Sequence, residues 1–290
     1  MPELPEVEHL RRSLESWIQG ARIRNVHLER LDVLDWRASP GTLKSDRNQA
    51  LLQGGRISCL DRHGKQMAIH TEDGRVLCVH LGMSGRMEIA RAEDELPAHT
   101  HCVWDLLAGR RRIQMRFVDP RRFGGLWTFR SRQKLLSDRW GALGPDAVSL
   151  DPESMAQQLR GRSRGLKASL LDQSVVAGLG NIYVDEALFE SKLHPRQPAG
   201  SLKQVEIGRL TTSVVGILRR AIKEGGSTIH TWADLTGDPG GFSTQHQVYG
   251  RGGEMCTTCG QRLSSAQVVQ RTTVWCSKCQ TIKRRKRWEI

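Results

Sequence analysis

Four cysteines near the end of the chain constrain its fold more than any other feature. They form two equally spaced pairs, Cys256-x2-Cys259 and Cys276-x2-Cys279, separated by sixteen residues. Each pair is typical of a tight turn whose two thiolates face one ion, and two such turns complete a tetrahedral four-cysteine site. We therefore expect a zinc ribbon over 251–290 that the metal ion holds folded. The four thiolates fill the coordination shell, so a structural zinc is favoured over a redox pair, an iron–sulfur cluster or a catalytic metal.

The charge of the chain indicates a polyanionic partner. There are 44 lysine and arginine residues against 31 acidic residues, a formal net charge of +13. Basic residues cluster at 110–112 and at 283–287. Clustering favours contact with nucleic-acid phosphates over a merely solvated basic surface.

The remaining cysteines and the hydropathy bound the compartment. Cys59, Cys78 and Cys102 stand alone, and a secreted disulfide protein would not normally leave three over. No apolar run approaches the roughly 18 residues of a membrane helix, and nothing resembles a signal peptide. We expect a cytoplasmic protein with no membrane partner.

The chain opens on a predicted helix over 5–19. Pro5 suits a first helical position and Gly20 a stop. The apolar residues recur at helical spacing and predict one buried stripe: Val7, Leu10, Leu14, Trp17 and Ile18.

Beyond this helix the periodicity divides the chain into segments. Short β-type runs separated by glycine and proline predict a sandwich or barrel, and helical periodicity returns after a polar stretch. The fold class is therefore α+β and multidomain. The predicted segments are a β domain with the N-terminal helix (1–130), a linker (131–149), a helical domain (150–224), a loop and connection (225–250), and the finger with its basic tail (251–290).

The first residues have a candidate chemistry of their own. Removal of Met1 exposes the secondary amine of Pro2 beside Glu3 and Glu6. An activated amine can form a Schiff base with a carbonyl carbon, and a nearby carboxylic acid can move protons. Taken alone, these residues are better explained as a helix start whose acids complement the helix dipole.

Five motifs favour the catalytic interpretation of Pro2, because together they resemble the formamidopyrimidine-DNA glycosylase family nearly end to end. They are Pro2-Glu3-Leu4-Pro5-Glu6-Val7-Glu8, His80-Leu81-Gly82-Met83-Ser84-Gly85-Arg86, Asp119-Pro120-Arg121-Arg122-Phe123-Gly124, Gly178-Leu179-Gly180-Asn181-Ile182-Tyr183, and Val248-Tyr249-Gly250-Arg251 before the four-cysteine finger. The resemblance implies an N-terminal β-sandwich with a helix, a helix-two-turn-helix domain over 150–224, and a C-terminal zinc finger.

The resemblance also implies catalytic roles. Pro2 corresponds to the nucleophile that attacks C1′ of the damaged nucleotide, and Glu3 to the proton donor and acceptor around the sugar. Glu6 supports the site. Lys65 matches a lysine that contacts phosphate and assists elimination, and Arg271 a finger arginine that grips phosphate during the second elimination.

Further positions match residues that contact DNA. Extruding a base leaves a gap in the duplex, which an apolar side chain and an arginine suit well. Met83, Arg121 and Phe123 match the family's gap-filling residues, and we call them the wedge residues. The remaining implied DNA contacts are His80, Asn181, Lys167, and, with less similar surroundings, Arg162 and His99, where the neighbouring His101 is an alternative.

The implied activity is excision of oxidised purines from double-stranded DNA by a monomer, followed by β- and δ-elimination at the abasic site. Leu4 between the two Pro-Glu pairs, the complete wedge set and a loop resembling the base-binding loop (225–242) favour purines over oxidised pyrimidines. Departures include Gly241, where an aromatic residue is common, and Met255, where proline is usual.

Three other functions are alternatives to this activity. One is a glycosylase with the same machinery for oxidised pyrimidines. Another is a protein that binds damaged DNA without catalysis. An N-terminal-proline tautomerase is the third, and the finger and the basic charge argue against it.

Overall fold

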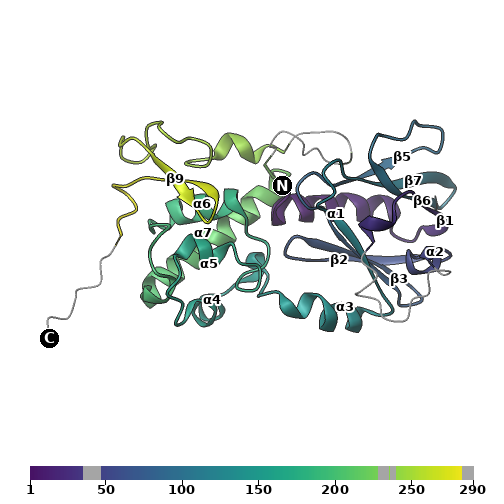
Figure 1. The fold of residues 1–290 in the computed structure, drawn as a ribbon, viewed down its shortest axis with the longest axis horizontal. Coiled ribbons are helices and arrows are strands. Elements are labelled where there is room, and N and C mark those ends of the chain that lie inside the picture. Colours follow the sequence, from purple (N-terminus) through teal and green to yellow (C-terminus); the bar gives the residue numbers. More distant parts are fainter. Residues whose placement is uncertain (35–46, 228–234, 236–239, 283–290) are drawn as a thin grey trace. The chain divides into compact units, whose positions relative to one another are not determined.

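The computed structural model describes residues 1–34, 47–227, 235 and 240–282 (Figure 1). The chain forms two compact units. The first contains Met1–Ala142 and Ile222–Ser243, and the second contains Leu143–Ala221 and Thr244–Ile290. None of the helices in the described ranges is long and apolar enough to cross a bilayer.

The first unit is a sandwich of two antiparallel four-stranded sheets. One sheet has the order β1-β6-β7-β5 and the other β2-β3-β4-β8. The strands are β1 (Arg22–Leu28), β2 (Ile57–His63), β3 (Gln66–Thr71), β4 (Val76–His80), β5 (Arg86–Ala90), β6 (Thr100–Ala108), β7 (Arg111–Val118) and β8 (Gly125–Phe129). This arrangement confirms the predicted β-sandwich.

The sandwich core includes the apolar stripe of helix α1 (Leu4–Ile18). Leu10, Leu14 and Ile18 share one buried cluster with Trp104 and Phe117 of the sheets. Gly20 ends the helix with a φ of +76°. The prediction that Trp17 belongs to the stripe was wrong, since 40% of its surface is exposed. Trp17 lies in the last turn of α1 at the edge of the stripe, about 100° around the helix axis from Ile18.

The expected linker contains structure. Helix α3 (Arg132–Asp138) begins at Ser131, whose hydroxyl accepts a hydrogen bond from the amide of Lys134. Leu135 is fully buried. One buried apolar residue in seven gives too little periodicity for a sequence pattern to detect. A short helix α2 (Arg47–Ala50) also belongs to this unit.

The second unit carries the remaining helices and the finger. Its helices are α4 (Pro152–Leu159), α5 (Leu166–Leu170), α6 (Asn181–Glu190) and nearly all of α7 (Gln204–Lys223). Strands β9 (Ser264–Val268) and β10 (Arg271–Trp275) form the finger hairpin. Phe189 of α6 packs in one apolar cluster with Val248, Leu263 and Val274. This arrangement agrees with the predicted helical domain followed by a finger, although the five predicted boundaries stay predictions.

Two predicted features lie outside the described residues. They are the basic tail (283–287) and most of the loop resembling the base-binding loop (228–234 and 236–239).

Candidate active site and metal centre

The start of α1 is held by the buried carboxylate of Glu6. Its Oε2 accepts a hydrogen bond of 2.8 Å from the amide of Glu3, and its Oε1 accepts one of 2.7 Å from the amide of Ser227. Gly226 has a φ of +87°, and a Cβ there would lie 2.6 Å from Glu6 Oε1. The glycine therefore lets the loop reach the helix start, and Glu6 fixes both.

The N-terminal amine lies among the charged residues predicted for catalysis. Burial lowers the pKa of this amine below its ordinary value, the carboxylates of Glu3 and Glu6 act to raise it, and Lys65 and Arg121 act to lower it further. The N-terminal amine thus lies near four of the predicted residues: Glu3, Glu6, Lys65 and Arg121. Pro2 is itself buried, whereas Met1 is 39% exposed. Trimming Met1 would place the new amine at a buried position.

Lys65 lies in the two-residue turn between β2 and β3. His63 and Gln66 pair across this turn, and Gly64 has a φ of +57°. Lys65 is only 9% exposed, so it is not the surface lysine that its place at a strand start alone would indicate. Its position next to β4 brings it close to His80, which pairs with Gln66 across the strands.

His80 is neutral at physiological pH in this environment. Burial is the largest cause, and the cations Arg139 and Lys65 act in the same direction, so that the pKa of His80 falls to about 4. Its predicted contact with DNA would then be a hydrogen bond from a neutral imidazole.

The wedge residues are presented by two turns that touch along their backbones. A Cβ on Gly82 would lie 2.3 Å from the carbonyl carbon of Phe123, so only glycine allows this approach. The buried carboxylate of Asp119 joins the turns, because it accepts hydrogen bonds from the hydroxyl of Ser84 (2.6 Å) and the amide of Gly124 (2.7 Å). The turns that carry the wedge residues are therefore held together.

The wedge side chains themselves remain accessible. Phe123 is 57% exposed, Met83 is half-buried, and the guanidinium of Arg121 lies 5.0 Å from the centre of the Phe123 ring. Phe123 therefore has surface with which to contact a partner, and Arg121 lies beside it.

The neighbouring histidines differ in accessibility. His99 is exposed, and its carbonyl accepts a hydrogen bond from the amide of Asp119. His101 is 1% exposed, and its Nε2 donates to the carbonyl of Asp119. Of the two, only His99 has surface with which to contact DNA.

Two predicted residues of the second unit, Asn181 and Lys167, lie where α6 meets the finger hairpin. The side-chain amide of Asn181 donates to the carbonyl of Thr272 (3.1 Å), and Lys167 Nζ lies 3.4 Å from the same oxygen. Lys167 also forms an ion pair of 2.6 Å with Asp185, and both side chains are buried. Asp185 accepts a further hydrogen bond from the amide of Val274.

The phosphate contact predicted for Lys167 stays a prediction. Its side chain has no exposed surface, and it contacts Asp185 and the backbone of β10. Spacing along the chain did not predict this ion pair, because Asp185 is eighteen residues away on another helix.

Arg271 is exposed at the start of β10, directly before the residue whose carbonyl is held. The hairpin turn before it has a positive φ at Val269 (46°) and Gln270 (60°), an uncommon conformation for a branched residue. Arg162 is half-buried, and its Nε donates to the carbonyl of Gln158.

Glu186 is a further structural residue that was not predicted from the sequence. Its carboxylate accepts hydrogen bonds from the amides of Gln247, Val248 and Tyr249 and so fixes the segment that leads into the finger. Two adjacent acids, Asp185 and Glu186, within an otherwise apolar helix were the available signal.

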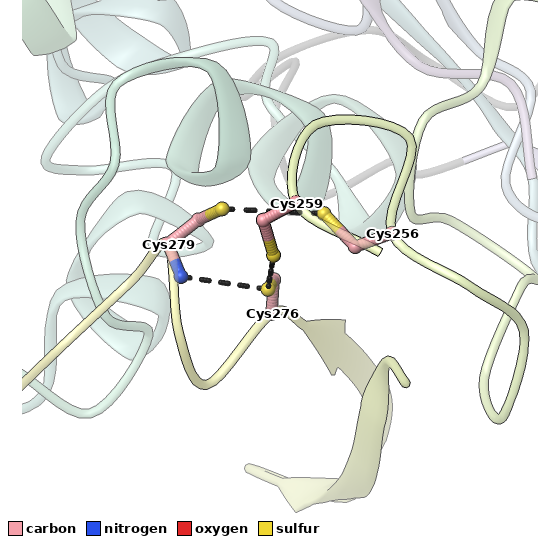
Figure 2. Close-up of side chains that lie close together, drawn as sticks. All are labelled: Cys256, Cys259, Cys276 and Cys279. Carbon is pink, nitrogen blue, oxygen red and sulfur yellow. Dashed lines mark hydrogen bonds between the residues drawn. The ribbon is translucent and has the colours of Figure 1, made fainter. Parts of the chain in front are cut away.

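The four finger cysteines are positioned to bind one metal ion. Figure 2 shows their sulfur atoms facing one another, and all four lie within 4.8 Å of each other. The Sγ–Sγ distance is 3.5 Å for Cys259 and Cys276 and 4.0 Å for Cys256 and Cys279. Four thiolates at about 2.3 Å from one ion in a tetrahedron lie about 3.8 Å apart, so the observed set fits a tetrahedral metal ion.

Fold and site together define a class of protein: a β-sandwich whose helix starts at a partly buried N-terminal amine, followed in the chain by a helical unit with a four-cysteine finger. Comparison with known sequences makes this specific. The profile of the Formamidopyrimidine-DNA glycosylase N-terminal domain matches residues 1–126, and that of the Formamidopyrimidine-DNA glycosylase H2TH domain matches residues 142–233. The chain belongs to the formamidopyrimidine-DNA glycosylase family.

Relatives that match over nearly their full length support this family assignment. The chain is 36% identical over 288 residues to the formamidopyrimidine-DNA glycosylase of Enterococcus faecalis, covering 99% of each protein. It is 39% identical over 283 residues to that of Stenotrophomonas maltophilia, covering 97% of this chain and 100% of the relative.

Similar solved structures contain DNA. The complex of the Lactococcus lactis Fpg with DNA containing an abasic site has a TM-score of 0.86 at 32% identity, with 97% of this chain and 100% of that chain covered. A complex of MutM with DNA containing carbocyclic 8-oxo-G has a TM-score of 0.84 at 33% identity, with the same coverage.

Proposed function

We propose that this protein is a base-excision-repair glycosylase that removes oxidised purines from double-stranded DNA and then cuts the resulting abasic site. The observation that carries the proposal is the partly buried N-terminal amine near Glu3, Glu6, Lys65 and Arg121. The lesion class follows from relatives that bind DNA containing 8-oxo-G or an abasic site.

The amine of Pro2 is the nucleophile once Met1 is removed. Its lone pair attacks C1′, the bond from C1′ to the base nitrogen breaks, and the base leaves with a proton. Burial lowers the pKa of the Met1 amine, and burial of the Pro2 amine would likewise raise the fraction that is neutral and nucleophilic. Glu3, two per cent exposed beside the amine, moves the protons.

Opening of the sugar ring, with a proton added to O4′, converts the adduct to an iminium ion. The iminium acidifies the C2′ proton, so its removal expels the 3′-phosphate. A second elimination expels the 5′-phosphate, and water then releases the remaining sugar fragment from Pro2. Lys65 next to the amine, and Arg271 on the finger, are the proposed phosphate contacts for these steps. Glu6 holds the geometry through its two backbone hydrogen bonds.

The wedge residues stabilise the extruded state. Unstacking a base costs a few kcal/mol, which insertion of an apolar side chain partly offsets. We assign Met83 and Phe123 to this insertion and Arg121 to the unpaired base on the other strand. His80, His99, Arg162 and Asn181 are further proposed DNA contacts, and Lys167 acts by placing the finger backbone.

The metal ion of the finger is assigned as zinc, because four thiolates in a closed tetrahedral set are its usual structural ligands. Cys256, Cys259, Cys276 and Cys279 hold it. The same proposal places catalysis in 1–130, DNA binding in 150–224 and the finger, and the protein in the bacterial cytoplasm as a monomer.

Borohydride trapping tests the mechanism. Reduction of an iminium should give a stable protein–DNA adduct with 8-oxoguanine DNA, and Pro2→Gly should abolish it. Lys203→Ala, an exposed residue of the second unit with no role in the proposed chemistry, is the control. Correctly processed protein that yields no adduct with 8-oxoguanine or abasic DNA refutes the covalent mechanism.

Lesion preference is tested separately by comparing single-turnover excision of 8-oxoguanine and of thymine glycol from matched duplexes. We expect faster excision of 8-oxoguanine. Faster excision of thymine glycol would instead support the pyrimidine alternative.

A further inference from the structure

A row of charged side chains on α1 faces strand β2. Arg11 donates to Glu15 (2.7 Å) and to the carbonyl of Leu60 (3.1 Å), and Glu15 accepts a hydrogen bond from the Leu60 amide (3.2 Å). Both backbone groups of one β2 residue are therefore held by the helix. This fixes the strand lengthwise against α1.

A second contact, nearer the catalytic end of α1, reaches the turn beyond β2. Glu8 Oε2 accepts a hydrogen bond of 3.0 Å from Arg62 Nε, and Arg62 Nη1 donates one of 2.9 Å to the carbonyl of Gly64. Gly64 directly precedes Lys65. The side chains of Arg62 and Glu8 are 7% and 10% exposed, so this is a buried connection and not a solvated surface pair.

The geometry of arginine makes this connection specific. One planar guanidinium uses two different nitrogens, one toward the carboxylate and one toward the carbonyl, and therefore fixes direction as well as distance. The path runs from α1, whose N-cap is Glu3 and whose first turn bears Glu6, to the residue before Lys65. The two side chains therefore connect the start of α1, with Glu3 and Glu6, to the turn that carries Lys65.

We propose that Glu8 and Arg62 are positioning residues that hold Lys65 at the N-terminal amine and thereby support the elimination steps. This inference rests on the role of Lys65 in the proposed function. Glu8 and Arg62 touch no substrate in this scheme.

The informative variant is Arg62→Met. Methionine fills much of the same buried volume but cannot donate to Gly64. Glu8 keeps Arg11 at 3.1 Å and Arg12 at 2.7 Å, so no buried carboxylate loses all its partners. Arg12→Gln is the matched control, because Arg12 contacts the same carboxylate at 2.7 Å but is 61% exposed.

The first measurement needs no DNA. Amide hydrogen exchange of the full-length protein is followed across residues 62–67. Release of the Gly64 carbonyl should raise exchange in this turn at least tenfold in Arg62→Met and leave it unchanged in Arg12→Gln. Unchanged exchange in Arg62→Met overturns the proposed connection.

The second measurement is single-turnover cleavage of DNA with a preformed abasic site. A displacement of about 1 Å can cost about 100-fold in rate, so we expect Arg62→Met to cleave about 10- to 100-fold more slowly at saturating DNA. Its Kd for DNA should stay within about twofold of the wild type. Arg62→Met should add no further loss in a Lys65→Met background, since residues that act through one another are not additive.

The outcomes separate this inference from the function beneath it. Wild-type protein that neither forms a borohydride adduct nor cleaves refutes the proposed function and this inference together. Wild-type protein that cleaves, with Arg62→Met equally fast, refutes the inference alone. An equal loss in the Lys65 and Lys65→Met backgrounds also refutes it, because Arg62 would then act by another route.

Discussion

Gly82 is the residue on which the arrangement of the wedge depends most directly. Its φ is +63°, and a Cβ there would lie 2.3 Å from the carbonyl carbon of Phe123 and 2.4 Å from the amide nitrogen of Gly124. Both atoms belong to the backbone, so no side-chain rotation relieves the overlap. Gly82→Ala must therefore push the two wedge turns apart by about 1 Å to restore an ordinary contact.

The cost has two parts. An alanine in the left-handed region costs about 1–2 kcal/mol. Forcing extra volume into a packed site adds about 1–3 kcal/mol, so we expect Gly82→Ala to lower the free energy of unfolding by about 2–5 kcal/mol. Gly109→Ala is the matched control, because Gly109 has a φ of +62° but nothing within 4 Å of its Cβ position. The control should show only the first part.

Denaturant titration of both variants measures these free energies. Excision of 8-oxoguanine should fall strongly in Gly82→Ala, because Met83 and Phe123 move with their turns, and should stay near wild type in Gly109→Ala. Equal destabilisation by the two substitutions, or full activity of Gly82→Ala, would refute the conclusion that the turns are held by this close approach.

Three further predictions concern charge and metal. Burial acts to raise the pKa of Glu8, but hydrogen bonds from Arg11 and Arg12 outweigh this effect and bring the pKa to about 2. Because this pKa lies below the value in the unfolded chain, Glu8 stabilises the fold above about pH 4.3. The stabilisation is lost as the pH falls toward 2. Unfolding free energies of wild type and Glu8→Gln should therefore converge by about 2–3 kcal/mol over that range, and a constant gap would contradict the assignment. NMR should find His80 titrating near pH 4, moving upward in Arg139→Gln because one lowering cation is lost, whereas a wild-type value of about 6.5 would show that His80 is not desolvated. Cys276→Ser should lower the zinc content and weaken binding to abasic DNA while α1 and the sandwich stay folded. Elemental analysis measures the zinc, a gel shift measures DNA binding, and circular dichroism follows the fold. Full zinc content in Cys276→Ser would exclude Cys276 as a ligand.

Short-range features were predictable from the sequence. The cluster of four cysteines follows from the spacing within two turns, since a Cys-x2-Cys turn brings its two sulfur atoms together wherever the finger lies. The helix at the start of the chain and its stop at Gly20 follow from local periodicity and φ preference. Local periodicity did not predict the exposure of Trp17 or the helix α3. Whether a residue at the edge of a stripe or in a seven-residue helix is buried depends on which other elements pack against that residue.

The sequence by itself determined the chemistry that the chain carries: an amine beside two carboxylates, four thiolates for one ion, and the motifs that resemble a glycosylase. Only the tertiary structure decided which groups meet. Arg62 reaches Glu8 across 54 positions, and Lys167 is buried against Asp185 instead of facing solvent. The physical reason is that strand register and helix packing, which are set by the whole core, bring such groups together, whereas spacing along the chain encodes only contacts within a turn or two.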